Sequence, residues 1–359
     1  MLIALRAAQG IGLSLIFVNS FSIIVSAFPV EKRGRVLGFL VASVYTGLSA
    51  GPFLGGIITQ HLGWRYIFFL SAAVSIVVFS IMLIFITKEW KPAEGQKFDL
   101  KGSVIFAFAI TSFMLGISFL PQIHGLILTL TGLAVFYYYR IDSRKTAHPV
   151  LKLNIFRNNK VFTFSNAAAL INYSATAGIS FMLSLYLQNI KTMSPQDAGL
   201  VLISQPLLMA FFSPVAGRIS DKIEPQYVAS AGMTLITVCL GFLCFISYET
   251  SILFIILNLS VLGIGFALFS SPNSNAIMSS VEKKEFGTAS TILALMRTMG
   301  QMMSMAAVIV IFSIIIGKAE IKQGNTGDLL FSLHLAFAFF SFLCFLGIFA
   351  SLFRGKMHK

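Results

Sequence analysis

The chain has 359 residues, of which 57% are hydrophobic and 11% are charged, and its mean hydropathy is +0.86. This composition excludes a soluble globular protein of this length, because there is too little polar sequence to cover its surface. The net charge of +13 would suggest nucleic-acid binding in a soluble protein. Here the basic residues lie in short segments between apolar runs, where membrane topology accounts for them.

The apolar runs are long enough to cross about 30 Å of hydrocarbon, and they predict an all-α, polytopic membrane protein. Eleven transmembrane spans are predicted, at residues 2–28, 36–58, 66–87, 102–120, 123–139, 162–187, 198–216, 227–247, 251–272, 288–316 and 328–352. Lys and Arg are concentrated in alternate connecting segments, beginning with residues 29–35 and ending with residues 353–359. This asymmetry predicts a multi-pass protein of the cell membrane with a cytoplasmic C-terminus.

An internal repeat relates the first predicted span to a later one. Gly10-Ile11-Gly12, Asn19-Ser20 and Val30-Glu31-Lys32 recur as Gly263-Ile264-Gly265, Asn273-Ser274 and Val281-Glu282-Lys283. Three spans precede the later copy within its half and none precedes the earlier one, so equal halves would need three further helices before residue 1. We therefore predict three regions: residues 1–87 as the remainder of an N-terminal bundle (three helices), 88–160 as a central linker with two extra transmembrane helices, and 161–359 as a C-terminal six-helix bundle.

A glycine stripe marks the second predicted span. Its members are Gly38, Gly47, Gly51, Pro52, Gly55 and Gly56. The glycines four residues apart share one helix face and predict a close approach of another helix, while the proline favours a bend. A packing face in any membrane protein is the alternative interpretation. A stripe that met lipid, with no helix against it, would remove the main support for an exporter.

At this point the chain resembles the major facilitator superfamily, because the stripe matches the antiporter signature on that family's fifth helix. The resemblance implies that the eleven spans correspond to helices 4–14 of fourteen. The residues Leu2, Arg6, Gln9, Gly10 and Gly12 resemble the fourth-helix motif, whose arginine is implicated in proton coupling. The central helix pair and the segment 63–69, which begins Gly-Trp-Arg, resemble the fourteen-helix drug:proton antiporters of the EmrB/QacA type.

The resemblance also implies a cytoplasmic gate. Gly217 and Asp221 stand in a segment that resembles the family's gating motif, and Arg33 and Arg35 stand in the loop before the fifth helix. Asp221 can accept hydrogen bonds from helix-end amides and pair with cations, which would form a breakable latch. A solvated charged turn is the alternative.

Two arginines lie inside predicted spans, which is costly and favours a functional role. Arg6 is a candidate for proton coupling with Gln9 and Gly10, and Arg297 is a candidate cavity charge. For both, a side chain that reaches the membrane surface is the alternative. Polar residues within spans, among them Asn172 and Gln205, are candidates to line a cavity or to form bonds between helices.

The sequence predicts a proton-coupled secondary transporter that exports hydrophobic or cationic drugs by alternating access. Such a protein would be monomeric, would contribute to drug resistance, and would have lipophilic small molecules, protons and membrane lipids as its partners. The histidines show no metal-ligand spacing and no phosphate-binding glycine loop is present, so neither an enzyme, an ATP-driven pump nor a cofactor is indicated. The alternatives are export of one metabolite or siderophore, and a truncated fragment that transports nothing. The thirteen acidic residues all lie in or at the edges of loops, which puts proton coupling by this chain alone in doubt.

Overall fold

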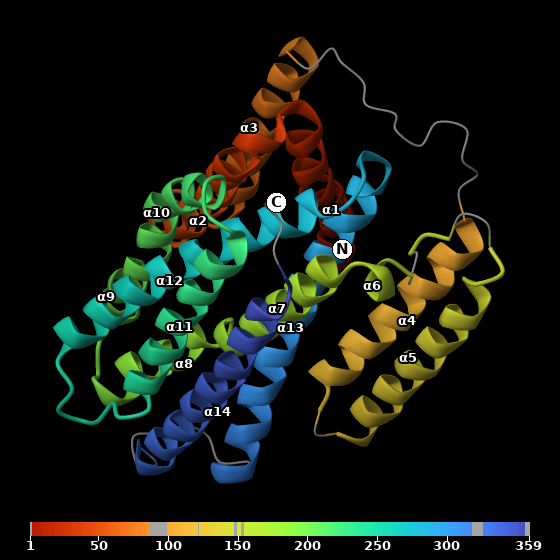
Figure 1. Ribbon diagram of the computed structural model, residues 1–359. Coiled ribbons are helices and arrows are strands. Elements are labelled where there is room, and N and C mark those ends of the chain that lie inside the picture. The colour runs from red at the N-terminus through yellow and green to blue at the C-terminus, as the bar shows by residue number, and fades with distance from the viewer. Residues whose placement is uncertain are drawn as a thin grey trace.

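The computed structural model in Figure 1 describes residues 2–85, 99–120, 122–146, 149–151, 154–317 and 326–355. The chain is an all-α, polytopic membrane protein. In this described part, nine helical segments are long and apolar enough to cross a membrane, and they correspond to nine of the predicted spans. The other two predicted spans, 36–58 and 123–139, fall within helices as well.

Three helices form the first region: α1 (Leu2–Ala27), α2 (Val30–His61) and α3 (Arg65–Phe85). Helix α2 begins directly after Pro29, whose fixed φ of -66° stands in extended backbone at the cap position. It ends before Gly63, which adopts a left-handed φ of +93° that a side chain would disfavour.

The central pair consists of α4 (Leu100–Ser118) and α5 (Ile123–Asp142). They pack on each other through glycines, and Figure 1 shows them as a pair at one edge of the molecule. A Cβ atom on Gly132 would lie 2.5 Å from the backbone nitrogen of Phe113, so only glycine allows this approach. A short helix, α6 (Asn154–Asn158), follows the pair.

The later region supplies six of the nine candidate spans, and two of these are interrupted. The first of these six, Lys160–Ile190, is divided into α7, α8 and a π-helix, and the second, Pro195–Ser220, is divided into α9 and α10. The elements are α7 (Lys160–Thr176), α8 (Ile179–Leu185), η1 (Tyr186–Ile190), α9 (Pro195–Leu202), α10 (Ser204–Ser220), α11 (Pro225–Leu243), α12 (Ile252–Ser279), the 3-10 helix η2 (Lys283–Glu285), α13 (Phe286–Ile315) and α14 (Thr326–Leu352).

Local sequence explains where several of these helices start. Asn159 accepts a hydrogen bond from the amide of Phe162 and so caps α7, and Ser251 caps α12 in the same way. Ser194 caps α9, which continues with proline at its first position. These caps satisfy amides that the helices leave without partners.

Most of the buried apolar side chains belong to this later region, where α11, α12 and α14 pack closely. The first region joins it chiefly through α2, which packs along α10 and α12. Figure 1 shows α2 and α10 side by side although they are far apart in the sequence. By contrast, α3 buries none of its residues. The proposed division at residues 87 and 160 stays a prediction.

Candidate functional site

The start of α2 packs against the end of α10 with almost no space between the two backbones. A Cβ atom on Gly38 would lie 2.5 Å from the carbonyl oxygen of Ser213 and 2.9 Å from the Cα atom of Pro214. A Cβ atom on Gly217 would overlap the carbonyl oxygen of Gly34. Glycine at these positions is therefore required by backbone contact between the two regions of the chain.

Asp221 joins the two regions at this contact. One carboxylate oxygen accepts a hydrogen bond from the amide of Gly34 at 2.7 Å, and the other accepts one from the amide of Arg35 at 2.9 Å. Asp221 caps the C-terminus of α10, where a negative charge is unfavourable by itself, but it points at the N-terminal part of α2, where helix amides favour an anion. The carboxylate is thus more stable with α2 in place than without it.

The two arginines of the predicted gate use their side chains elsewhere. The Arg33 guanidinium is buried, lies 5.3 Å from the ring centroid of Phe286 and donates to the carbonyl oxygen of Phe28. The Arg35 guanidinium lies over the ring of Phe39 at 5.9 Å. The structure therefore brings the segment 33–35 together with Gly217 and Asp221, and the described bonds to Asp221 are from main-chain amides.

A second polar network lies at the same end of the later helices. Arg354 is 1% exposed and donates to Asn273 Oδ1 at 2.9 Å, to Ser165 Oγ at 3.2 Å, to Ser351 Oγ at 2.6 Å and to the carbonyl oxygen of Pro225 at 3.4 Å. Burial lowers the pKa of the Arg354 guanidinium to about 9, against an opposing effect of Glu224. The guanidinium stays protonated at neutral pH and ties α7, α11, α12 and α14 together.

The glycine stripe gives a different result from the prediction. No heavy atom of the described residues lies within 4 Å of a Cβ atom built on Gly47, Gly51 or Gly55. The expectation that a helix packs on this stripe is therefore wrong for the described chain, and close packing on α2 occurs earlier, at Gly34 and Gly38. The reason is that α10 and α12 meet α2 along its first half, whereas spacing of glycines shows only where an approach is sterically allowed. The side chains of Pro52 and Gly56 lie outside the described residues.

The predicted proton-coupling residues lie apart from this contact. Gln9 and Gly10 stand on the exposed part of α1, and no described atom approaches a Cβ atom on Gly10 within 4 Å. The side chain of Arg6 lies outside the described residues.

A cavity of about 260 Å³ lies between the two regions. It is lined by residues of α2, α7, α8, α10, α12 and α13, together with Ala177 between α7 and α8. Two of its walls are the interruptions in the membrane helices. Thr176 ends α7 and Ser180 belongs to α8, while Gln205 and Pro206 open α10. Pro206 has no amide hydrogen to give to the preceding turn, which explains the break after α9.

The guanidinium of Arg297, on α13, belongs to the lining of this cavity and is surrounded by aromatic rings from three other helices. It lies 5.3 Å from the ring centroid of Phe17 on α1, 5.4 Å from that of Tyr173 on α7 and 6.0 Å from that of Tyr45 on α2. The faces of aromatic rings carry negative potential and stabilise a cation at this distance. Arg297 therefore connects helices from both regions at the cavity.

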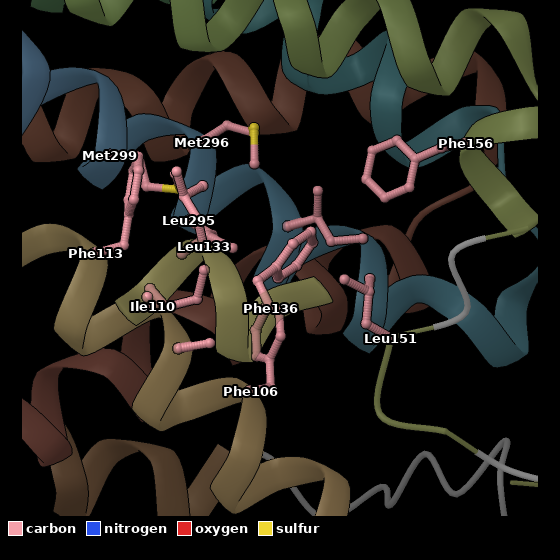
Figure 2. Close-up of a pocket in the computed structure, with 13 residues that line it drawn as sticks. Phe106, Ile110, Phe113, Leu133, Phe136, Leu151, Phe156, Leu295, Met296 and Met299 are labelled. Carbon is pink, nitrogen blue, oxygen red and sulfur yellow. The ribbon is translucent and has the colours of Figure 1, made fainter. Parts of the chain in front are cut away.

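A second cavity, of about 200 Å³, separates the α4–α5 pair from α13. Figure 2 shows Phe106, Phe113 and Phe136 from the pair facing Met296 and Met299 of α13. Its lining is entirely apolar, whereas the first cavity holds a charge and several amides and hydroxyls. The two neighbours Met296 and Arg297 line different cavities, so α13 forms a wall of both.

This architecture of two helical regions around a central cavity agrees with the family comparison. The model of the Major Facilitator Superfamily matches residues 1–305, and a second match covers residues 165–358. The chain belongs to the Major Facilitator Superfamily.

Three characterised or named relatives are similar over most of this superfamily chain. The riboflavin transporter RibZ of Clostridioides difficile is 27% identical over 352 residues, which cover 98% of this chain and 77% of RibZ. The lincomycin resistance protein LmrB of Listeria monocytogenes is 26% identical, with 99% of this chain and 78% of LmrB covered. The multidrug resistance protein Stp of Mycobacterium tuberculosis is 26% identical, and the match covers 84% of this chain and only 57% of Stp. Their names refer to riboflavin transport, lincomycin resistance and multidrug resistance, respectively.

Sequence reasoning missed most of the cavity lining. Tyr45 and Tyr173 of the lining, and Phe17 beside Arg297, look like ordinary bundle aromatics in the sequence. Of the lining, only Arg297 and Gln205 stood out as polar residues within spans. Asn172 is fully buried and does not belong to the lining. The three rings come from three separate helices, so no local pattern in the sequence reveals that they meet at Arg297.

Proposed function

We propose that the chain is an exporter of small lipophilic molecules that works by alternating access, with the proton gradient as its energy source. The glycine stripe, on which no described helix packs, no longer supports this proposal. The observation that carries it instead is the pairing of a closed contact with a cavity. At one end, α2 and α10 meet backbone to backbone with Asp221 between them, and further along the same two helices line the cavity beside Arg297. A carrier needs one end closed while its central site is accessible from the other.

The contact has the properties of a latch that can open. Two charge-assisted hydrogen bonds and close glycine packing hold it, and no described covalent bond crosses it. Opening exposes a carboxylate and two amides, all of which water can solvate. The two states can therefore differ by a few kcal/mol, which a substrate or a proton gradient can overcome. We place this closed end at the cytoplasmic face, with the C-terminus on the same side.

The names of two relatives support a drug-exporting function. LmrB and Stp are named for resistance, and the matches with them cover 99% and 84% of this chain. A second candidate, transport of one metabolite, is favoured by the 98% coverage of this chain by RibZ, which is named as a riboflavin transporter. Fold alone does not separate the two, because the superfamily carries many substrates.

The test is transport by the chain in sealed vesicles with an imposed proton gradient. Uptake of radiolabelled lincomycin and of riboflavin into inside-out vesicles is compared with and without a protonophore. Protonophore-sensitive uptake of lincomycin supports drug export, and uptake of riboflavin alone supports the metabolite function. Failure to move either compound, with the chain correctly inserted, contradicts both and favours the fragment that transports nothing.

A further inference from the structure

The central cavity carries a positive charge without an acidic partner. Arg297 is the charged residue of its lining, and no Asp or Glu is found among the described lining residues. The acidic residues of the described helices stand at helix ends, such as Asp142, Asp197 and Asp328. The electrostatic field in the cavity is therefore set by a guanidinium, and field lines are weakly screened in such a low-dielectric site.

The aromatic rings hold this charge in the cavity and leave it positive. Rings stabilise a cation through their quadrupoles and do not neutralise it. Arg297 lies about 16 Å along α13 from its first residue, Phe286, at the usual rise per residue. Its contacts with Phe17, Tyr45 and Tyr173 place the guanidinium toward the other helices. The alternative from the sequence, a side chain that reaches the membrane surface, does not account for these three contacts.

Two amide side chains of the cavity have unused hydrogen-bonding capacity. Gln205 is 9% exposed, and in the described part of the chain neither its amide nor that of Gln301 has a hydrogen-bond partner. Both residues line the cavity, so their amides can form hydrogen bonds with the polar atoms of a ligand that enters it. The hydroxyl of Tyr173, by contrast, is within 3.4 Å of Ser270 Oγ.

From this arrangement we infer that the cavity selects aromatic organic anions and disfavours organic cations. The guanidinium supplies paired donors for a carboxylate or a similar acidic group. The rings of Tyr45 and Tyr173, with Phe266, supply faces and edges for a planar ring system. Gln205 and Gln301 supply donors and acceptors for its heteroatoms. This inference rests on the proposed function, because the ligand is taken to be the exported molecule, and it removes cationic drugs from the expected substrates.

Equilibrium binding to the full chain in lipid nanodiscs tests the inference. Fluorescein serves as the aromatic anion and ethidium as the aromatic cation, and fluorescence anisotropy reports both. We expect tighter binding of fluorescein than of ethidium. Arg297→Gln should weaken fluorescein binding by roughly tenfold or more, since a hydrogen bond to a charged group is lost, and should leave ethidium binding unchanged or stronger. Arg297→Lys should retain part of the affinity for fluorescein.

Arg144→Gln is the matched control, because Arg144 is exposed between α5 and α6 and takes no part in the cavity. Circular dichroism and size-exclusion chromatography show whether each variant is folded. If Arg297→Gln does not fold, the comparison of fluorescein affinity is made with Arg297→Lys. Three results would overturn the inference: ethidium binding more tightly than fluorescein to the unaltered chain, no saturable binding of fluorescein, or equal fluorescein affinity in the folded Arg297 and control variants.

Export in vesicles separates this inference from the proposed function. If nanodiscs show the preference for fluorescein but vesicles export neither dye nor drug, the proposed function is wrong and the charge preference stands. If vesicles with the unaltered chain export ethidium faster than fluorescein, the charge preference is wrong and the exporter function stands.

Discussion

Two stretches of α2 contain glycine at comparable density and behave differently. Along the first stretch, Gly34 and Gly38 lie against the backbone of α10. Along the second, Gly47, Gly51 and Gly55 have no described atom close enough to contact a Cβ atom. The same residue type is required by packing in one place and is unconstrained by packing in the other.

The difference shows that small residues permit an approach without producing one. What brings α10 to the first stretch is a specific polar contact, the carboxylate of Asp221 on two amides of α2, in addition to the shape of the surfaces. The predictions that follow change one stretch or the other, in order of decreasing expected effect.

Gly217→Leu should have the largest effect, because its side chain would overlap the backbone at Gly34. A clash with backbone is relieved only by moving whole helices, and we expect a loss of about 3 kcal/mol, the upper end for overpacking. Thermal unfolding followed by circular dichroism measures it. Gly199→Leu is the control, since no atom lies within 4 Å of a Cβ atom there. Equal melting temperatures for the two variants would contradict close packing at the first stretch.

Arg354→Gln should have the next largest effect, because it removes charge-assisted bonds to Asn273, Ser165 and Ser351 at the end of the bundle that carries this contact. We expect a loss of about 2 kcal/mol, since several buried acceptors lose a charged donor. Denaturation in guanidinium chloride measures the loss. Arg157→Gln, at an exposed site in α6, is the control and should change stability little. A loss no greater than that of the control would show that the network adds nothing to stability.

Asp221→Asn should loosen the first stretch without unfolding the chain. The side-chain oxygen of Asn can accept from only one of the two amides of α2, and its NH2 group faces the other donor, so one bond is lost and the remaining one loses its charge, at a cost of about 1.5 kcal/mol or more. A cysteine placed at the buried position 213 by Ser213→Cys then reports the opening through its rate of maleimide labelling. Asp142→Asn, distant on α5, is the matched control. Labelling that is no faster in Asp221→Asn than in the control would contradict the latch.

Gly51→Leu should have the smallest effect on stability, below about 0.5 kcal/mol, because open space surrounds its Cβ position. The same variant tests the antiporter motif when protonophore-sensitive export is measured. Lost export at unchanged stability would support a functional role for the second stretch, and unchanged export would exclude one for Gly51.

Much of the helical architecture was predictable, because a long apolar run has few alternatives in a membrane. The interruptions within Lys160–Ile190 and Pro195–Ser220 were not predicted, although Gly178 lies at the first and Pro206 lies at the second. Gly178 lies between α7 and α8, where its amide donates to Ser304 Oγ on α13 at 2.9 Å. No local sequence pattern reveals this contact. For the site, the sequence indicated Asp221 through the resemblance of its segment to a gating motif, and Arg297 through its charge within a span. It did not indicate what surrounds them, because those partners are backbone amides and rings of distant helices.

The manner in which Asp221 is bound determines which substitutions α2 can accept over evolutionary time. The bond from residue 35 is made by its main-chain amide, so any residue that retains an N–H group can donate it. Proline alone lacks that group and is excluded there. Position 34 has no such latitude, since any larger residue meets α10. Two adjacent residues that share one acceptor are thus under different constraints, because size limits position 34 and the need for an N–H group limits position 35.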